Sequence, residues 1–217
     1  MAECEVEMVR VAAVVHVKGC GVDSLLETFV SDLKRRGIRV RGLIQRNYGI
    51  GCRAKMELID LDSGDTFQIS QCLGPGSSAC RLNPDGVAAA SMALRQALDK
   101  PMDLLVANRY GSIELQGHGL ADEMLAAMCA GIPLITSVAT PHLDGWRRFT
   151  GGLGDELDPE PQSIMTWWQR VMERRPPINS TTIGSRGGPD FYNHLHDGLV
   201  QSHAAQPREV GSGVVNF

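Results

Sequence analysis

Val11-Ala-Ala-Val-Val-His-Val-Lys-Gly-Cys-Gly-Val-Asp-Ser-Leu-Leu26 is the stretch that decides the fold. Its first seven residues are mostly apolar or β-branched, and they predict a buried parallel strand. Gly19 and Gly21 then predict a tight turn, and an amphipathic helix follows from about Asp23. Strand, glycine turn and helix form the layout of a phosphate-binding loop, in which backbone N–H groups and the helix dipole face an anion.

The stretch departs from the full phosphate-loop pattern, which is G-x-x-x-x-G-K-[ST]. When Gly21 is aligned with the last glycine, the first glycine falls on His16, the lysine on Val22 and the hydroxyl residue on Asp23. An aspartate at this position would repel a phosphate, and it suits a helix N-cap. Lys18 could turn toward the loop, although its offset differs. Three interpretations stay open: a plain strand-to-helix turn, an anion site and a working nucleotide hydrolase.

Length and composition restrict the class of protein. The 217 residues suffice for one domain of about 170 residues with an appendage. The net charge of −4 argues against a nucleic-acid partner or an anionic membrane surface. There is no apolar run of membrane-span length and no signal-peptide pattern at the start. The six cysteines form no CxxC pair, so we expect reduced thiols and a cytoplasmic protein.

Strands alternate with helices along the chain. We predict strands over 11–17, 38–46, 103–108 and 133–138, a hairpin over 56–61 and 66–70, and helices over 23–36, 84–98, 120–130, 142–149 and 161–174. This alternation predicts an α/β fold, namely a doubly wound, mostly parallel sheet with helices on both faces. Residues 1–175 would form this domain. The composition changes at Pro176, and residues 176–217 are predicted to be an extended C-terminal arm that packs on the domain or on a neighbouring subunit.

Ligands of doubly wound sheets bind beyond the carboxyl ends of the strands. The residues that follow the predicted strands, together with two predicted loops at 47–53 and 71–84, are rich in arginines and amides. Planar guanidinium groups suit phosphate and other oxyanions, although each arginine alone is also compatible with a solvated surface position. The candidate anion- or nucleotide-binding residues at this edge are Lys18, Gly19, Cys20, Gly21, Asp23, Ser24, Gln45, Arg46, Arg53, Gln71, Arg81, Asn108 and Arg109.

One group of side chains near the C-terminus has metal-ligand chemistry. His194 and His196 share a face if the chain is extended there, and His203 or Asp197 could supply a third ligand. The spacing matches no standard zinc site. The alternative is that these histidines bond to backbone groups or to solvent.

Several stretches together resemble DUF2478, a bacterial family of unknown function related to phosphate-loop nucleoside-triphosphatases. The resemblance covers about residues 9–170 and implies a degenerate phosphate-loop NTPase-like fold. It rests on Gly42-Leu-Ile-Gln-Arg-Asn47, Cys52-Arg-Ala-Lys-Met-Glu-Leu58, Ile69-Ser-Gln-Cys-Leu-Gly74, Cys80-Arg-Leu-Asn-Pro84, and Asn108-Arg-Tyr-Gly-Ser-Ile-Glu114 with Gly117-His-Gly119.

The resemblance also bears on catalysis. Related active triphosphatases carry Asp-Glu-Ile-Gly…Glu at this last stretch, and its carboxylates hold the magnesium water and the attacking water. Here Asn108 and Arg109 stand at the Asp-Glu pair, and only Gly111 and Glu114 match. Phosphoryl transfer depends on such groups for charge neutralisation and positioning. The resemblance therefore implies a protein that binds its ligand without efficient hydrolysis of nucleoside triphosphates.

These observations support three functional hypotheses. The first is an oxyanion- or nucleotide-binding accessory protein, which is not an enzyme. Genes of the DUF2478 family, which this sequence resembles, often lie beside molybdate-uptake genes. Molybdate and tungstate are therefore candidate ligands, and a nucleotide is the other candidate. The second is a divergent magnesium-dependent triphosphatase, in which Glu114 positions water and Lys18 replaces the missing lysine. The third is a scaffold, a homo-oligomer assembled through residues 176–217.

Overall fold

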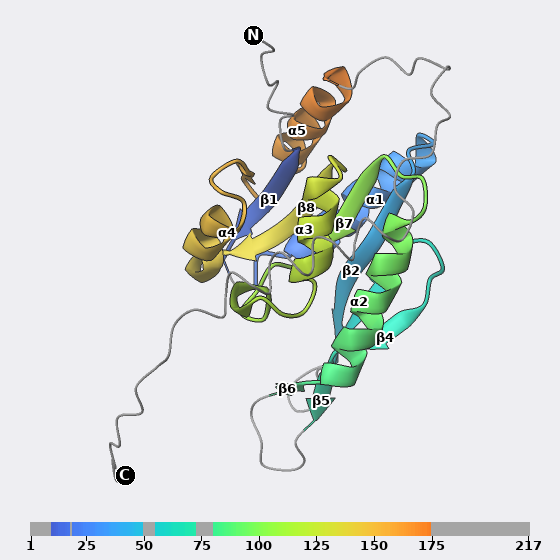
Figure 1. Ribbon diagram of the computed structural model, residues 1–217, viewed down its shortest axis with the longest axis vertical. Coiled ribbons are helices and arrows are strands. Elements are labelled where there is room, and N and C mark those ends of the chain that lie inside the picture. The colour runs from blue at the N-terminus through green and yellow to red at the C-terminus, as the bar shows by residue number, and fades with distance from the viewer. Residues whose placement is uncertain (1–9, 18, 50–54, 73–79, 175–217) are drawn as a thin grey trace. The chain divides into compact units, whose positions relative to one another are not determined.

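The computed structural model describes residues 10–17, 19–49, 55–72 and 80–174, without the side chains of 71, 72, 80 and 81 (Figure 1). All of them belong to the first of two units, Met1–Arg175 and Pro176–Phe217. The predicted arm and its histidines His194, His196 and His203 lie outside the described residues, as do Lys18 and Arg53. The predictions made for these residues therefore remain predictions.

The described elements follow the alternation that the sequence predicts. In chain order they are β1 (Val11–His16), α1 (Val22–Arg35), β2 (Val40–Tyr48), β3 (Lys55–Asp60), β4 (Thr66–Gln68), β5 (Ser70–Cys72), β6 (Cys80–Leu82), α2 (Pro84–Leu98), β7 (Leu104–Ala107), the short 3-10 helix η2 (Glu114–Gln116), α3 (Ala121–Cys129), β8 (Leu134–Ala139), η3 (Thr140–His142), α4 (Leu143–Phe149), β9 (Asp155–Leu157) and α5 (Pro161–Glu173).

Seven of the strands form one sheet in the order β4-β3-β2-β7-β8-β1-β9. The pairs β2–β7, β7–β8, β8–β1 and β1–β9 are parallel, whereas β3 and β4 add an antiparallel edge beside β2. This arrangement confirms the predicted mostly parallel sheet. Gly42 lets β2 approach β7 closely, because a Cβ atom there would lie 2.0 Å from the carbonyl oxygen of Val106.

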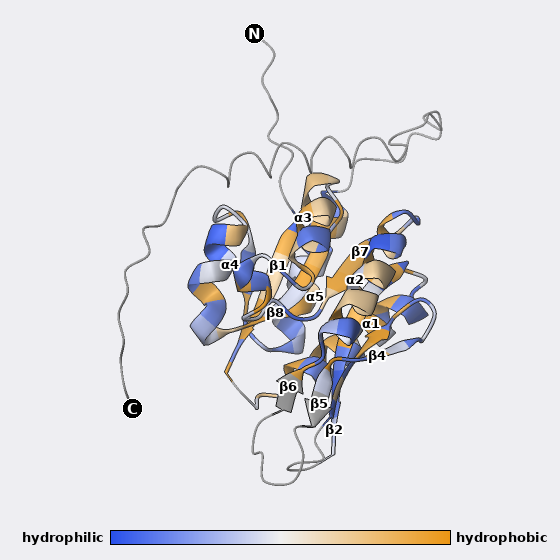
Figure 2. Cartoon of the chain, turned by 60° about the horizontal axis from the view of Figure 1, so that its bottom comes forward, coloured by the Kyte–Doolittle hydropathy of each residue, from blue (hydrophilic) through white to orange (hydrophobic). Residues whose placement is uncertain are grey.

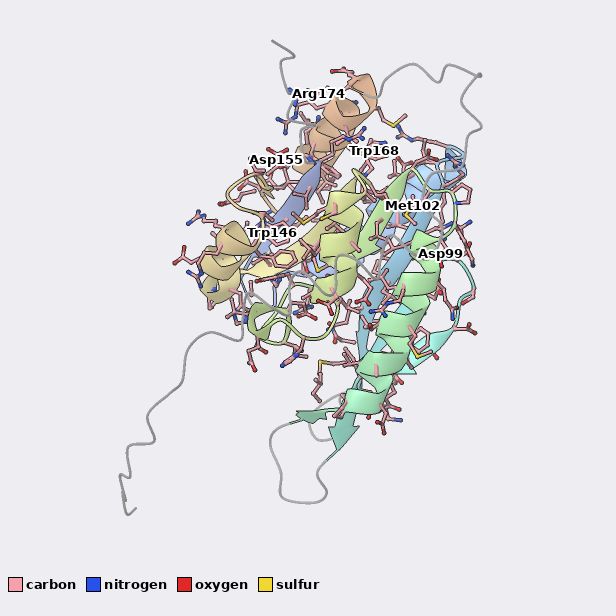
Figure 3. All side chains as sticks on the ribbon, viewed as in Figure 1. Asp99, Met102, Trp146, Asp155, Trp168 and Arg174 are labelled. Atoms are coloured by element: carbon pink, nitrogen blue, oxygen red, sulfur yellow. The ribbon has the colours of Figure 1, made fainter. Side chains whose placement is uncertain are left out.

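Helices cover both faces of the sheet, as a doubly wound fold requires. Alternate residues of β1 point to opposite faces, so Ala12 and Val14 join the core beneath α1 and α5, while Val11 and Ala13 join the core beneath α2, α3 and α4. The central strand β7 is hydrophobic throughout, and β1 is hydrophobic up to its last residue, His16 (Figure 2). Trp168 on α5 and Trp146 on α4 mark the two cores (Figure 3).

The structure differs from the sequence prediction at the ends and edges of the sheet. β2 continues to Tyr48 rather than ending at Arg46, because it pairs with β3 as far as Lys55. The predicted loop over 71–84 includes β6, which pairs with β5. β9 was not predicted, since it has three residues of which only Leu157 is buried. Among the described helices, none has the length and apolar character that a membrane span requires.

Candidate functional site

The turn between β1 and α1 presents backbone donors at the carboxyl edge of the sheet. Gly19 and Gly21 have φ angles of 85° and 74°, in the left-handed region that favours glycine. Gly21 is the N-cap of α1, and no side chain caps this helix. The prediction that Asp23 caps it is therefore wrong. The first N–H groups of a helix have no intrahelical acceptor, so they carry partial positive charge toward the turn.

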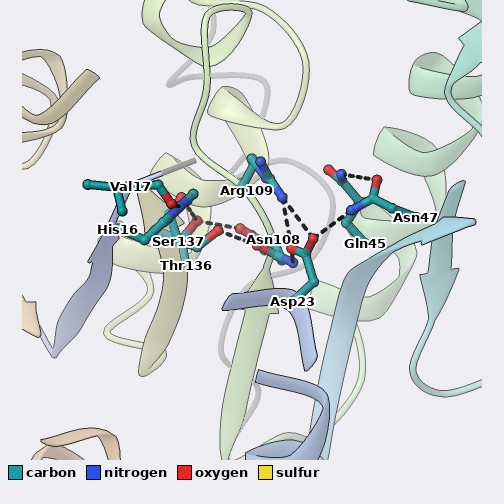
Figure 4. A network of polar contacts seen from close by, with 10 residues as sticks. His16, Val17, Asp23, Gln45, Asn47, Asn108, Arg109, Thr136 and Ser137 are labelled. Atoms are coloured by element: carbon teal, nitrogen blue, oxygen red, sulfur yellow. Dashed lines mark hydrogen bonds and ion pairs between the residues drawn. The ribbon is translucent and has the colours of Figure 1, made fainter. Parts of the chain in front are cut away.

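The Asp23 carboxylate instead turns toward the strand ends and accepts four hydrogen bonds (Figure 4). Nη2 of Arg109 lies 2.9 Å from both carboxylate oxygens. Nδ2 of Asn108 donates to Oδ1 at 3.0 Å, and Nδ2 of Asn47 donates to Oδ2 at 2.7 Å. Gln45 in turn donates to Oδ1 of Asn47 at 2.8 Å. These five residues form a polar cluster, which we name the Asp23 cluster.

The neighbouring strand β8 fixes the orientation of the cluster. The hydroxyl of Ser137 donates to Oδ1 of Asn108, so the amide N–H₂ of Asn108 faces Asp23. Thr136 beside it donates to the carbonyl oxygen of Ala107 at 2.6 Å. Asn108, Thr136 and Ser137 are fully buried. Their hydrogen bonds therefore form in a dry environment, where a misplaced polar group would be costly.

Two buried polar atoms near the cluster have no hydrogen-bond partner among the residues that the structure describes. They are Nε of Arg109 and Nε2 of His16. The side chains of Asp23 and Arg109 are only 19% and 30% exposed, so their ion pair is largely shielded from water. His16 ends β1, and its Nδ1 lies 3.1 Å from the carbonyl oxygen of Val17. Buried polar atoms without a partner are rare in proteins, which makes these two atoms notable beside the cluster.

Comparison with known proteins now places the chain. The model of the family described as "Protein of unknown function (DUF2478)" matches residues 11–167. The chain belongs to the DUF2478 family. It is 41% identical over 172 residues to "Molybdenum import ATP-binding protein ModC 2" of Bradyrhizobium diazoefficiens. That match covers 78% of this DUF2478 chain and 19% of the relative, so the chain spans about a fifth of the relative's length.

A solved structure shows the same fold. The crystal structure of THEP1 from the hyperthermophile Aquifex aeolicus is similar with a TM-score of 0.53 and 14% sequence identity. The similarity covers 76% of this chain and 99% of the other. The DUF2478 chain thus has the fold of phosphate-loop nucleoside-triphosphatases. At this low identity, the comparison extends to the fold alone.

The Asp23 cluster joins the first turn of α1 to the carboxyl ends of β2 and β7. In phosphate-loop enzymes, a loop Ser or Thr and a strand-end Asp hold Mg²⁺. In this DUF2478 chain the loop position is Asp23, and the strand end carries Asn108 and Arg109. The loop position thus carries a negative charge instead of a neutral hydroxyl, and the strand end carries an amide and a positive charge instead of a carboxylate. The residues at the two positions bind one another. The guanidinium group of Arg109 supplies positive charge opposite the loop.

The structure brings together some of the predicted site residues and separates others. Asp23, Gln45, Asn108 and Arg109 meet in the Asp23 cluster. Arg46 is half-exposed and pairs with Glu27 of α1 at 2.5 Å, outside the cluster. Cys20 and Ser24 are exposed beside Gly19 and Gly21 at the turn, and Lys18, Arg53 and the side chains of Gln71 and Arg81 lie outside the described residues.

Glu114 has a structural environment. It is buried, and its Oε2 accepts from the backbone N–H of Gly111 at 2.9 Å. Its Oε1 accepts from the N–H of Leu120 at 3.1 Å, and Leu120 is the N-cap of α3. Both carboxylate oxygens therefore brace the segment between β7 and α3. The hypothesis that Glu114 positions water has no support in this geometry and remains an untested prediction.

Proposed function

We propose that this DUF2478 protein binds a small oxyanion, or the phosphate groups of a nucleotide, without magnesium and without efficient hydrolysis. The observation that carries the proposal is the ion pair between Asp23 and Arg109. Mg²⁺ prefers oxygen ligands, whereas Arg109 has only N–H donors and a positive charge that repels a cation. Oδ1 of Asn108 already accepts from Ser137. The strand end is therefore equipped to receive anions rather than metal ions.

The turn before α1 supports the same proposal from the other side. Gly21 caps the helix without a side chain, so the first N–H groups remain available to an anion. The Nε–H group of Arg109 is buried without an acceptor among the described residues and offers a further donor. Backbone donors, amides and a guanidinium group suit a tetrahedral oxyanion.

The ligand that we propose is molybdate or tungstate, with a nucleotide as the alternative. A homologous segment is part of a protein named for ATP binding in molybdenum import. Segments joined in one polypeptide commonly serve one process, which supports an accessory function in molybdenum or tungsten handling. In this proposal the protein is a cytoplasmic homo-oligomer. Native mass spectrometry of the full chain would give the number of subunits and any anion that co-purifies.

The direct test is a thermal-shift and calorimetric titration with molybdate, tungstate, phosphate and ATP, each with EDTA and with Mg²⁺. At a ligand concentration of 100 Kd, binding stabilises a protein by about 2.7 kcal/mol, which corresponds to about 5 to 11 °C for a chain of this size. We expect such a shift in EDTA with at least one ligand. No shift with any ligand, or a shift that needs Mg²⁺, would contradict the proposal.

Two variants connect the titration to the site. Arg109→Ala removes the only charged donor of the Asp23 cluster, so we expect an affinity about 10- to 100-fold lower. Arg46→Ala is the matched control, because Arg46 pairs with Glu27 outside the cluster, and its affinity should stay within twofold of the wild type. Phosphate release from Mg-ATP should remain at background. A turnover that Glu114→Gln abolishes would favour the triphosphatase instead.

A further inference from the structure

Arg109, Asn108 and Asn47 donate to a common point and form an anion-binding site, which we call the receptor. The anion that occupies it in this structure is the protein's own Asp23 carboxylate. We propose that the Asp23 carboxylate is an internal competitor: the external oxyanion binds Arg109, Asn108 and Asn47 by displacing it. The inference rests on the proposed function, and it adds how the site is regulated. It also identifies Asp23 as the residue that sets the affinity of the site.

The hydrogen-bond geometry is that of an occupied oxyanion receptor. Oδ1 of Asp23 accepts from Asn108 and Arg109, and Oδ2 accepts from Asn47 and Arg109, all within 3.0 Å. The donors come from the carboxyl ends of two neighbouring strands, β2 and β7, while the acceptor comes from α1. Arg109 contacts both carboxylate oxygens through Nη2 alone, and charge-assisted hydrogen bonds of this kind, together with the convergent amides, suit carboxylates and phosphates.

Two of the three donor residues, Asn108 and Asn47, have hydrogen bonds that do not involve Asp23. Ser137 fixes the amide of Asn108 from β8, and Gln45 donates to the amide oxygen of Asn47 within β2. Because these contacts do not depend on Asp23, the two amide groups remain positioned for another anion when Asp23 moves away. Preorganisation of this kind lowers the cost of binding.

The carboxylate of Asp23 is also an incomplete occupant. It leaves the buried Nε–H group of Arg109 without an acceptor among the described residues. A carboxylate has two oxygens, whereas a tetrahedral oxyanion has four and can engage more donors at once. The unused donor therefore points to an external ligand with more oxygens than Asp23 supplies.

Displacement predicts that Asp23 weakens binding of the external ligand. The apparent affinity falls in proportion to the fraction of molecules in which the receptor is open. Asp23 also places a negative charge in the first turn of α1, where an incoming anion would meet it. Asp23→Ser removes the competitor and supplies the hydroxyl residue of the full phosphate-loop pattern. We expect this variant to bind at least about tenfold more tightly than the wild type.

Glu27→Ser is the matched control. Glu27 lies on the same helix one turn further along, is half-exposed and pairs with Arg46 rather than with Arg109. Each variant removes one carboxylate from α1. If a lower negative charge alone raises the affinity for the oxyanion, both variants should bind more tightly. If Asp23 competes with the oxyanion, only Asp23→Ser should bind more tightly.

The experiment is isothermal titration of the full chain with sodium molybdate and with inorganic phosphate, in EDTA, for the wild type and both variants. The expected result is at least a tenfold lower Kd for Asp23→Ser and an unchanged Kd for Glu27→Ser. Equal or weaker binding by a folded Asp23→Ser protein would overturn the inference, as would an equal gain in both variants. In those cases the proposed function stands if the wild type binds.

The other outcomes separate the two claims. If Asp23→Ser binds the oxyanion and the wild type does not, the inference that Asp23 occupies the receptor is supported, and the proposed function of the wild type is rejected. Absence of binding in all three proteins would reject both. If Asp23→Ser does not unfold cooperatively, Asp23→Asn replaces it, because the amide keeps the size of the side chain and removes its charge. A gain of at least about threefold is then expected, and no gain would reject the inference.

Discussion

One arginine–aspartate pair lies at the amino ends of the parallel strands and another at their carboxyl ends. The two pairs differ in how many of the arginine's hydrogen-bond donors have an acceptor. At the amino edge, Arg39 donates to Asp103 from its backbone N–H, Nε and Nη2 at 2.9 to 3.0 Å. The hydrogen bond and the charge of Asp103 raise the pKa of Arg39. At the carboxyl edge, Arg109 uses only Nη2 toward Asp23, and its buried Nε has no acceptor among the described residues.

The difference separates a structural contact from a candidate site. The Arg39–Asp103 pair joins the segments where β2 and β7 begin, and its guanidinium group is half-exposed. In the Asp23–Arg109 pair the arginine is less exposed to solvent. The cluster around this pair includes residues of α1, of β2 and of the end of β7, and Nε of Arg109 is a donor without an acceptor among the described residues. The Arg39–Asp103 pair thus has the contacts of a structural ion pair, whereas the Asp23–Arg109 pair lies at the edge where doubly wound sheets bind ligands and retains a donor with no acceptor in the described part of the chain.

The largest effect on stability is expected at the amino edge. Asp103→Ala leaves Arg39 without its carboxylate and empties a buried position, so we expect a loss of about 3 kcal/mol and a Tm lower by about 6 to 12 °C. Asp32→Ala is the control, because Asp32 pairs with Arg35 and Arg36 on the surface of α1, and it should cost less than about 1 kcal/mol. Urea unfolding measures both, and molybdate affinity should stay unchanged. A loss of affinity in Asp103→Ala would break the distinction between the two edges.

A smaller effect is expected at the carboxyl edge, where orientation matters more than stability. Ser137→Ala removes the hydroxyl that fixes the amide of Asn108, so we expect about tenfold weaker oxyanion binding with a stability loss of about 1 to 2 kcal/mol. Thr136→Val is the matched control, because Thr136 donates to the backbone of Ala107 rather than to the cluster. It should cost similar stability and leave affinity unchanged. Equal affinity in the two variants would show that Ser137 does not position Asn108.

The sequence predicts the centre of this fold well and its edges poorly. α2 begins and ends at the predicted residues 84 and 98, and β7 and β8 lie within two residues of the predicted strands. Buried strands and amphipathic helices have periodic patterns that local reading detects. β5, β6 and β9 have three residues each, and pairing with a neighbouring strand stabilises them. No local pattern reports such pairing.

The sequence predicts which residues lie at the candidate site better than it predicts which of them bind one another. Asn108, Arg109 and Gln45 follow from the rule that strand ends bind ligands. Asn47 does not, because the predicted strand stops at Arg46, whereas β2 continues and places residues 45 and 47 on one face. Asp23 looks like a helix cap in isolation. Its actual partner is 86 residues away, and only the order of strands in the sheet brings the two together.

The smallest effect concerns acid sensitivity, and it too distinguishes the edges. Near the start of β2, Asp62 accepts from Lys100 and Arg41, and these hydrogen bonds lower its pKa, that from Lys100 most strongly. A carboxylate with a lowered folded-state pKa stabilises the fold above its unfolded pKa, here 3.8, and this contribution is lost as the pH falls through the folded value. Lys100→Gln should therefore reduce the free energy of unfolding at pH 7.

Because Asp62 is 36% exposed, we expect the reduction to be below about 1 kcal/mol. The difference between Lys100→Gln and the wild type should shrink as the pH is lowered below 3.8, since Asp62 then becomes protonated in both proteins. Urea unfolding at pH 7 and at pH values below 3.8 measures this. A difference that persists at low pH would mean that Lys100 contributes through packing of its alkyl chain. Oxyanion affinity at pH 7 should not change in this variant, because Lys100 lies with Asp62 near the start of β2, whereas the proposed binding site lies at the carboxyl ends of β2 and β7.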